Sequence, residues 1–215
     1  MRIICIGRQF GSGGHEIALR VGQQLGIPVY EKNILHLACK YGGLAVKTLE
    51  DADEKATNPY LYRVVCEGNH HVPRGLPTSE VLFALQSHEI RRIAAQEDCI
   101  FVGRCADFVL RDTDARLLRV FVSAPFETRI QRKMDQEQLS HSRAVRLVRR
   151  MDRQRSKYRE HYTGLSWNDP AGWDLMLDTS VLSIEQAAEE VAARYLALNV
   201  MRAWEYSPAP VLKLP

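Results

Sequence analysis

The sequence lacks any long apolar run, and this absence argues against insertion into a membrane. A helix needs about 20 consecutive apolar residues to cross a bilayer, and no segment of this 215-residue chain approaches that length. The chain also opens directly on an apolar strand pattern, without the features of a signal peptide. We therefore expect a single cytoplasmic domain, residues 1–215, with a buried core and no membrane partner.

Cysteine is scarce, and its spacing lacks any metal or disulfide pattern. The chain has an odd number of cysteines and no C-x-x-C pair. Cys5 and Cys99 lie in apolar runs, which favours reduced thiols in a core. His70 and His71 follow Cys66 without a second pair of ligands at a suitable spacing, so we expect no structural metal site. The five cysteines are Cys5, Cys39, Cys66, Cys99 and Cys105.

A glycine-rich segment lacks two residues that usually accompany such loops. It reads GRQFGSGG from Gly7 to Gly14, between an apolar run and a helical pattern. A strand, a glycine turn and a helix N-terminus in this order direct backbone N–H groups at an anion, typically a phosphate. A standard P-loop ends in Gly-Lys-Ser/Thr, whereas this one ends in Gly13, Gly14 and His15. The lysine and the magnesium-binding hydroxyl are both missing.

Two interpretations of this turn stay open on its residues alone: a ligand-free strand-to-helix connection, and a phosphate-binding loop. Its position after the first strand favours phosphate binding. Arg8 stands where the usual motif has its leading glycine, and its guanidinium can supply the missing positive charge. Imidazole is a poor ligand for Mg²⁺, so we expect the ion to be held through phosphates, water and a carboxylate such as Glu16. The expected phosphate-binding residues are Arg8, Gly11, Ser12, Gly13, Gly14 and His15.

The net charge of +3 is distributed unevenly along the chain. Eleven Lys or Arg and only three acidic residues lie between Arg129 and Arg159, so this segment carries +8 and the rest of the chain −5. Most charge runs are solvated helix faces, but an excess of one sign without compensating acids favours an anionic ligand. Nucleic acid is the less favoured ligand, because aromatic residues that stack on single strands are not interleaved here.

Five short apolar segments alternate with helical patterns. The expected strands are 2–6, 28–30, 99–103, 117–122 and 173–177, and the clearest helices are 78–96 and 183–198. Unbroken apolar strands that alternate with helices predict an α/β fold with a parallel sheet of about five strands and helices on both faces.

Polar residues follow two of these strands where parallel sheets bind ligands. Arg104 comes after Gly103 and is suited to bidentate phosphate binding; the alternative is a salt bridge, for which Asp107 is the nearest partner. The segment Asp178-Thr179-Ser180 either walls a nucleotide base or forms a local Asx turn.

Two groups of residues in the basic segment have helical spacing. Arg129 and Arg132 lie one turn apart on a helix that begins near Pro125. Arg149, Asp152 and Arg155 share a face, and we expect Asp152 to hold the two neighbouring guanidinium groups in position.

Taken together, these residues resemble the cytidylate kinase-like family, a branch of the P-loop nucleoside monophosphate (NMP) kinases. The resemblance implies a P-loop NTPase-type core, an NMP-binding insertion at 31–90 and a helical lid at 139–163. The matching segments run nearly the whole chain in the family's order: Gly7–Gly14, Leu25–Tyr30, Val102–Asp107, Asp152–Arg155, His161–Gly164 and Trp173–Ser180.

The resemblance also implies an activity: ATP-dependent phosphoryl transfer to a small acceptor, an NMP such as CMP, with ATP and Mg²⁺ as cofactors. The missing lysine and hydroxyl leave an alternative open, a nucleotide-binding regulatory protein with little or no kinase activity. By position, the resemblance assigns the donor phosphates to Gly11–His15, the acceptor's phosphate to Arg104, and the transferring group to Arg149 and Arg155, ordered by Asp152. Arg129 and Arg132 match the arginines that start the helix leading to the family's lid, and we expect them to bind the acceptor with Arg104. The expected base wall, from its place after a strand, is Asp178, Thr179 and Ser180.

Overall fold

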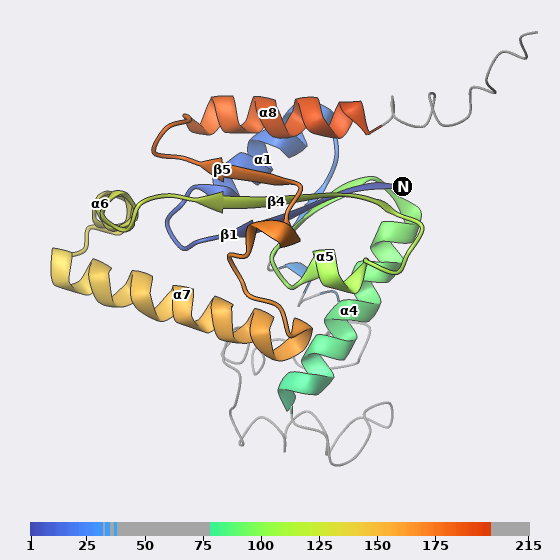
Figure 1. Cartoon of the computed structure of the whole chain (residues 1–215), viewed down its shortest axis with the longest axis horizontal. Coiled ribbons are helices and arrows are strands. Elements are labelled where there is room, and N and C mark those ends of the chain that lie inside the picture. Colours follow the sequence, from blue (N-terminus) through green and yellow to red (C-terminus); the bar gives the residue numbers. More distant parts are fainter. Residues whose placement is uncertain (32, 35–36, 38–77, 199–215) are drawn as a thin grey trace, which may run out of the picture.

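The computed structural model describes residues 1–31, 33–34, 37 and 78–198, and a five-stranded parallel sheet lies at its centre. The strand order is β2-β3-β1-β4-β5 (Figure 1). The α/β class and the five parallel strands expected from the sequence are therefore confirmed. The strands are β1 (Arg2–Arg8), β2 (Val29–Tyr30), β3 (Cys99–Val102), β4 (Arg116–Ser123) and β5 (Leu175–Asp178).

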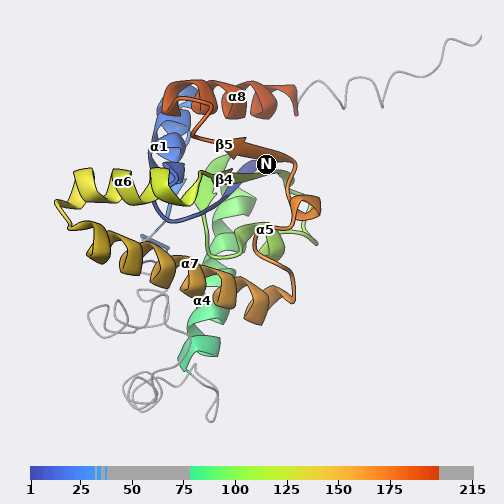
Figure 2. The same cartoon turned by 60° about the vertical axis from the view of Figure 1, so that its left-hand side comes forward.

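Helices cover both faces of this sheet (Figure 1). On one face lie α1 (Gly14–Leu25) and α8 (Ile184–Ala197), and on the other α4 (Thr78–Gln96) and the short α5 (Ala106–Val109). After β4, α6 (Phe126–Glu137) and α7 (His141–Thr163) form a hairpin, which Figure 2 shows from the side. A short 3₁₀ turn, Pro170–Gly172, precedes β5. No helix in the described part of the chain is long and apolar enough to span a bilayer.

The central strand β1 is buried on both faces, which explains its unbroken apolar sequence. Ile4 and Ile6 point into the core beneath α1 and α8, whereas Ile3 and Cys5 point into the core beneath α4 and α5. The alternation of side chains along a strand thus divides one apolar run between two cores. Packing on both faces fixes the position of β1 and of the loop that follows it.

Helix boundaries follow local signals where the sequence has them. Ser183 Oγ accepts a hydrogen bond from the Gln186 N–H, and the Gln186 side chain accepts one from the Ser183 N–H, a capping box that begins α8. This cap lies at the first residue of the helix expected at 183–198. Most of the expected insertion, together with Cys39, Cys66, His70 and His71, lies outside the described residues.

The three described cysteines are free and buried, as a reduced core requires. Burial raises the pKa of Cys5, and it raises the pKa of Cys99 and of Cys105 to about 12. These thiols therefore stay protonated at pH 8, where the thiol form is a poor nucleophile. We expect iodoacetamide to leave all three unmodified in the folded protein and to label them fully in guanidinium, as measured per residue by mass spectrometry. Labelling of the folded protein at the unfolded rate would contradict this.

Candidate functional site

The candidate site lies at the carboxyl ends of the strands, around β1. Because β3 flanks β1 on one side and β4 on the other, the connections reverse direction there, and such switch points bind ligands in open α/β sheets. Two pockets meet at this edge. We call the first the loop cleft, because Gly11, Gly13, Gly14 and His15 of the glycine loop line it. Its volume is about 700 Å³, within the range of about 300–1,000 Å³ for small-molecule sites. The inner pocket, beside α5 and α7, encloses about 50 Å³.

The glycine loop lines the loop cleft with its backbone. Gly11 and Gly13 have φ of 78° and 85°, the left-handed region that glycine adopts without strain. Helix α1 begins directly after Gly13, and no side chain of the described residues caps its first turn. The first N–H groups of α1 can therefore bind an anion in the cleft. Gly11, Gly13, Gly14 and His15 all line the cleft.

Ser12 supports this loop from the side opposite the cleft. Its side chain is fully buried, and Oγ lies 2.9 Å from the Gln9 carbonyl oxygen and 3.0 Å from that of Val122. The hydroxyl thus ties the loop to β4 and points away from the cleft.

Arg8 fills the space next to the position of the missing lysine. A Cβ on Gly14 would lie 2.6 Å from Arg8 Cβ, closer than real Cβ atoms approach. A Cβ on Gly103 would lie 2.1 Å from Arg8 Nη1. Glycine at these two positions lets the Arg8 side chain cross the strand ends, and a side chain at position 14 is incompatible with one at position 8. This geometry supports the hypothesis that the guanidinium replaces the lysine.

Glu31, directly after β2, joins Arg8 to His15. Arg8 Nη2 donates to Glu31 Oε1 at 2.9 Å, and His15 Nδ1 lies 2.6 Å from Glu31 Oε2. Burial raises the pKa of Glu31, but the charges and hydrogen bonds of Arg8 and His15 outweigh it and hold the pKa below its usual value. Both carboxylate oxygens are therefore engaged. Glu31 was not predicted from the sequence, although an acidic residue directly after an expected strand was a usable signal.

Asp152 contacts the loop backbone instead of its neighbours on α7. The Phe10 N–H donates to Asp152 Oδ1 at 2.8 Å, and Arg129 Nη1 lies 2.5 Å from Asp152 Oδ2. Buried Arg129 also donates to the carbonyl oxygens of Ala124 and Phe10. This differs from the expectation that Asp152 orders Arg149 and Arg155 and that Arg129 binds the acceptor. The α6–α7 hairpin brings Asp152 and Arg129 together, and the pair braces the loop from behind.

We expect Asp152→Asn to lower the free energy of unfolding by about 3 kcal/mol, because it leaves the buried Arg129 guanidinium without its counter-charge. Urea denaturation measures this. Asp135→Asn is the control: Asp135 is exposed on α6 and bonded to Gln131, so its loss should cost under about 0.5 kcal/mol. Equal midpoints for Asp152→Asn and the parent would contradict the bracing role.

Arg155 lines both pockets. Its Nη1 donates to the Arg8 carbonyl oxygen at 3.2 Å, and its guanidinium lies 5.3 Å from the centre of the Phe10 ring. Arg149 is exposed, with its guanidinium 5.3 Å from the Phe126 ring, and it is not among the described residues that line either pocket. Of the three residues expected at the transferring group, only Arg155 therefore reaches both pockets.

Arg132, which we expected to bind the acceptor beside Arg104, lines the loop cleft and not the inner pocket that Arg104 lines. Its Nη1 donates to Thr179 Oγ1 at 2.7 Å and its Nη2 to the Thr179 carbonyl oxygen at 2.6 Å. Thr179 Oγ1 in turn donates to the Ser12 carbonyl oxygen at 2.8 Å, so this contact also supports the loop.

The segment after β5 forms a local turn. Asp178 Oδ1 accepts hydrogen bonds from the N–H and the hydroxyl of Ser180, which is the Asx-turn alternative. Neither Asp178, Thr179 nor Ser180 is among the described residues that line the loop cleft, where Ile184 stands instead. A base-wall role for the three residues stays a prediction that this placement does not support.

Arg104 lines the inner pocket from a strained backbone. Gly103, Arg104 and Cys105 have φ of 78°, 59° and 52°, three left-handed residues in succession. For residues other than glycine this conformation costs about 1 kcal/mol each, and such strain gathers at functional sites. Asp107, the expected partner of Arg104, instead binds Arg159, as described below.

A metal ion would find few oxygen ligands here. The described residues contain no group of three or more His, Cys, Asp or Glu that could hold one. The carboxylates that line the loop cleft belong to Glu16 and Glu31, and both oxygens of Glu31 are engaged. These residues fit a magnesium ion held mainly by phosphate oxygens and water.

The chain is similar in sequence to proteins of a known family. The sequence profile of the cytidylate kinase-like family matches residues 3–181. A cytidylate kinase of Methanopyrus kandleri is 28% identical over 187 residues, which cover 83% of this chain and 84% of that protein.

Solved structures share the fold. An uncharacterized protein from Eubacterium ventriosum superposes with a TM-score of 0.68 at 24% identity, covering 92% of this chain and 99% of the other. A gluconokinase from Sinorhizobium meliloti gives 0.54 at 15% identity, covering 95% and 97%. The profile match over most of the chain and the shared fold lead to one conclusion: the chain belongs to the cytidylate kinase-like family and has the fold of a P-loop kinase, a phosphotransferase.

Proposed function

We propose that the protein transfers the terminal phosphoryl group of ATP to the phosphate of a nucleoside monophosphate. The observation that carries this proposal is that Arg8 and Arg155 line both the loop cleft and the inner pocket. With the ATP phosphates on the N-terminus of α1 and the acceptor beside Arg104, the transferring group would lie between two guanidinium groups. Phosphoryl transfer depends chiefly on such alignment and charge neutralisation.

The carboxylates of the site favour an acceptor whose attacking oxygen is already ionised. An alcohol acceptor would need a general base within hydrogen-bond reach. Among the described residues of the inner pocket the one carboxylate is Asp107, and Arg159 binds both of its oxygens. Of the two carboxylates that line the loop cleft, Glu31 is likewise engaged through both oxygens, and Glu16 is the one that we assign to the magnesium ion. A phosphate monoester needs no base, and the arginines of the inner pocket suit its charge.

The Mg²⁺ that accompanies ATP would neutralise charge on the phosphate oxygens. The loop cleft would hold the ion through phosphates and water, with Glu16 as the nearby carboxylate. The proposed lid is α7, which coincides with the expected segment 139–163. Its middle is fixed to the loop by Asp152, so closure that excludes water would involve its N-terminal turns.

The experiment is to incubate the protein with ATP, Mg²⁺ and a panel of nucleoside monophosphates and small alcohols, and to detect phosphorylated products by mass spectrometry. CMP comes first in the panel, because the Methanopyrus kandleri relative is named a cytidylate kinase. We expect CDP from CMP and no phosphorylated alcohol. Tight ATP binding in calorimetry without transfer to any acceptor would contradict the proposal and favour a regulatory protein. A phosphorylated alcohol would contradict the proposed acceptor class.

A further inference from the structure

We infer that the buried ion pair of Asp107 and Arg159 is a positioning pair, which holds Arg104 and Arg155 at a fixed separation across the inner pocket. The inference rests on the proposed function, because it assigns a role to residues that act through those two arginines. Asp107 and Arg159 themselves need not touch the transferring group.

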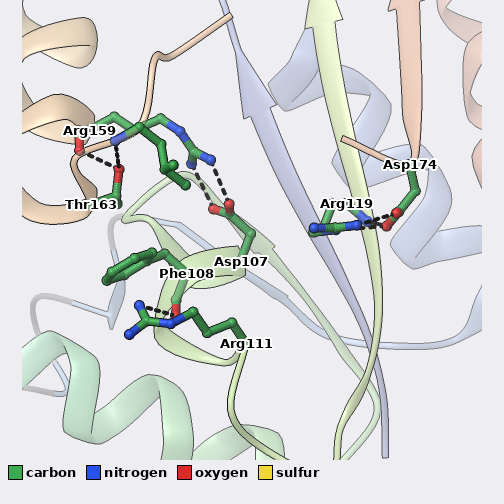
Figure 3. Close-up of polar contacts among 8 residues, drawn as sticks. Asp107, Phe108, Arg111, Arg119, Arg159, Thr163 and Asp174 are labelled. Carbon is green, nitrogen blue, oxygen red and sulfur yellow. Dashed lines mark hydrogen bonds and ion pairs between the residues drawn. The ribbon is translucent and has the colours of Figure 1, made fainter. Parts of the chain in front are cut away.

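The geometry of the pair is specific. Arg159 Nη1 donates to Asp107 Oδ1 at 3.0 Å and Nη2 donates to Oδ2 at 2.8 Å, so two parallel hydrogen bonds join the planar groups (Figure 3). The side chains are 5% and 9% exposed. A buried fork-to-fork contact fixes both a distance and an angle between the segments that carry it. Here those segments are α5 and α7.

Each partner stands close in the chain to a proposed functional arginine. Arg155 lies one turn before Arg159 on the same helix, and Arg104 lies three residues before Asp107, at the entrance to α5. Among the ion pairs of the described residues, this is the one that joins α5 to α7. A change in the contact would therefore move the two arginines relative to each other.

Further contacts hold both the guanidinium and the backbone of Arg159. It lies 4.6 Å from the centre of the Trp173 ring, a cation–π distance. Thr163 Oγ1 donates to the Arg159 backbone carbonyl oxygen at 2.7 Å and supports the last turn of α7 (Figure 3). Because Asp107 neutralises Arg159, the pair adds little charge to the pocket. Its contribution is geometric.

A second ion pair offers a matched control. Arg119 on β4 binds Asp174 through Nη2–Oδ1 at 2.6 Å and Nε–Oδ2 at 3.1 Å, again with two parallel contacts (Figure 3). It fixes the segment before β5 to the sheet, and neither residue is among the described residues that line the two pockets. The pair is more exposed than that of Asp107 and Arg159.

The test compares Asp107→Asn, Arg159→Lys and the control Asp174→Asn in steady-state kinetics with ATP and CMP. Arg159→Lys keeps the charge but loses the fork. For both variants of the pair we expect kcat to fall at least about tenfold and the KM for CMP to rise at least about threefold, with the KM for ATP within about twofold. Asp174→Asn should leave all three within about twofold. A folded variant of the pair that changes only the melting temperature would overturn the inference.

If the single variants do not fold, the double variant Asp107→Asn/Arg159→Gln takes their place, because it leaves no buried charge unpaired. We expect it to regain the parental melting temperature with kcat still lowered at least about tenfold; parental kcat would overturn the inference. If the parent itself transfers no phosphate, the proposed function fails separately. In that case crystal structures of the parent and of Asp107→Asn test the positioning role directly. We expect the Arg155 guanidinium to move away from the Phe10 ring in the variant. An unchanged position of that guanidinium overturns the positioning role.

Discussion

Replacing Arg155 with alanine should lower kcat by about a thousandfold while the affinity for ATP changes by less than about threefold. Arg155 lines both pockets, so its charge acts where the transferring group would lie between donor and acceptor. In the proposed arrangement the loop backbone would hold the donor phosphates independently of Arg155, so we expect ATP binding to survive the substitution. A coupled assay of ADP release measures kcat, and calorimetry measures affinity.

Arg153 is the control for that experiment. It lies on α7 two residues before Arg155, is exposed, and is not among the described residues that line the pockets. Arg153→Ala removes the same charge from the same helix and should change kcat by less than about threefold. Equal turnover by Arg155→Ala and the parent would remove Arg155 from the mechanism.

Replacing Arg8 with glycine should weaken ATP affinity at least about thirtyfold, because it removes the guanidinium that we propose replaces the P-loop lysine. The structure also predicts how that loss can be repaired. Position 8 is where the standard motif has its leading glycine, and a Cβ at position 14 would lie 2.6 Å from Arg8 Cβ. The standard loop has Gly and Lys at these positions, whereas this chain has Arg and Gly. Each arrangement leaves room for one side chain.

The exchange variant Arg8→Gly/Gly14→Lys should therefore recover most of the ATP affinity that Arg8→Gly loses. Gly14→Lys alone should weaken ATP binding, since its Cβ clashes with that of Arg8. Calorimetric titration of the parent and the three variants gives all four affinities. If Gly14→Lys alone binds ATP as well as the parent, or the exchange variant recovers nothing, the two side chains do not replace each other.

The sequence predicted those elements that depend on interactions between residues close together in the chain. The loop after β1 was found because glycines with positive φ and a helix N-terminus follow a buried strand. The helix from Ser183 was found because serine is a common cap residue and an acidic residue, Glu185, follows in the first turn. The five strands were found because strands buried on both faces must be apolar throughout.

The partners of the charged residues could not be predicted in this way. Helical spacing places Asp152 on one face with Arg155, but it says nothing of Arg129, which the α6–α7 hairpin brings opposite. The nearness of Asp107 to Arg104 in the chain was likewise misleading. The backbone at Arg104 and Cys105 is left-handed, and Asp107 pairs with Arg159, 52 residues away. Such pairings depend on how whole helices pack.

The central claim is that the amides of the loop and the Arg8 guanidinium together bind the polyphosphate of the donor. A crystal structure with the non-hydrolysable analogue AMP-PNP tests it most directly. We predict the triphosphate in the loop cleft, on the N–H groups at the start of α1, with the Arg8 guanidinium within hydrogen-bond distance of a phosphate oxygen. A nucleotide bound elsewhere, with the loop empty and Arg8 still held by Glu31, would contradict the account.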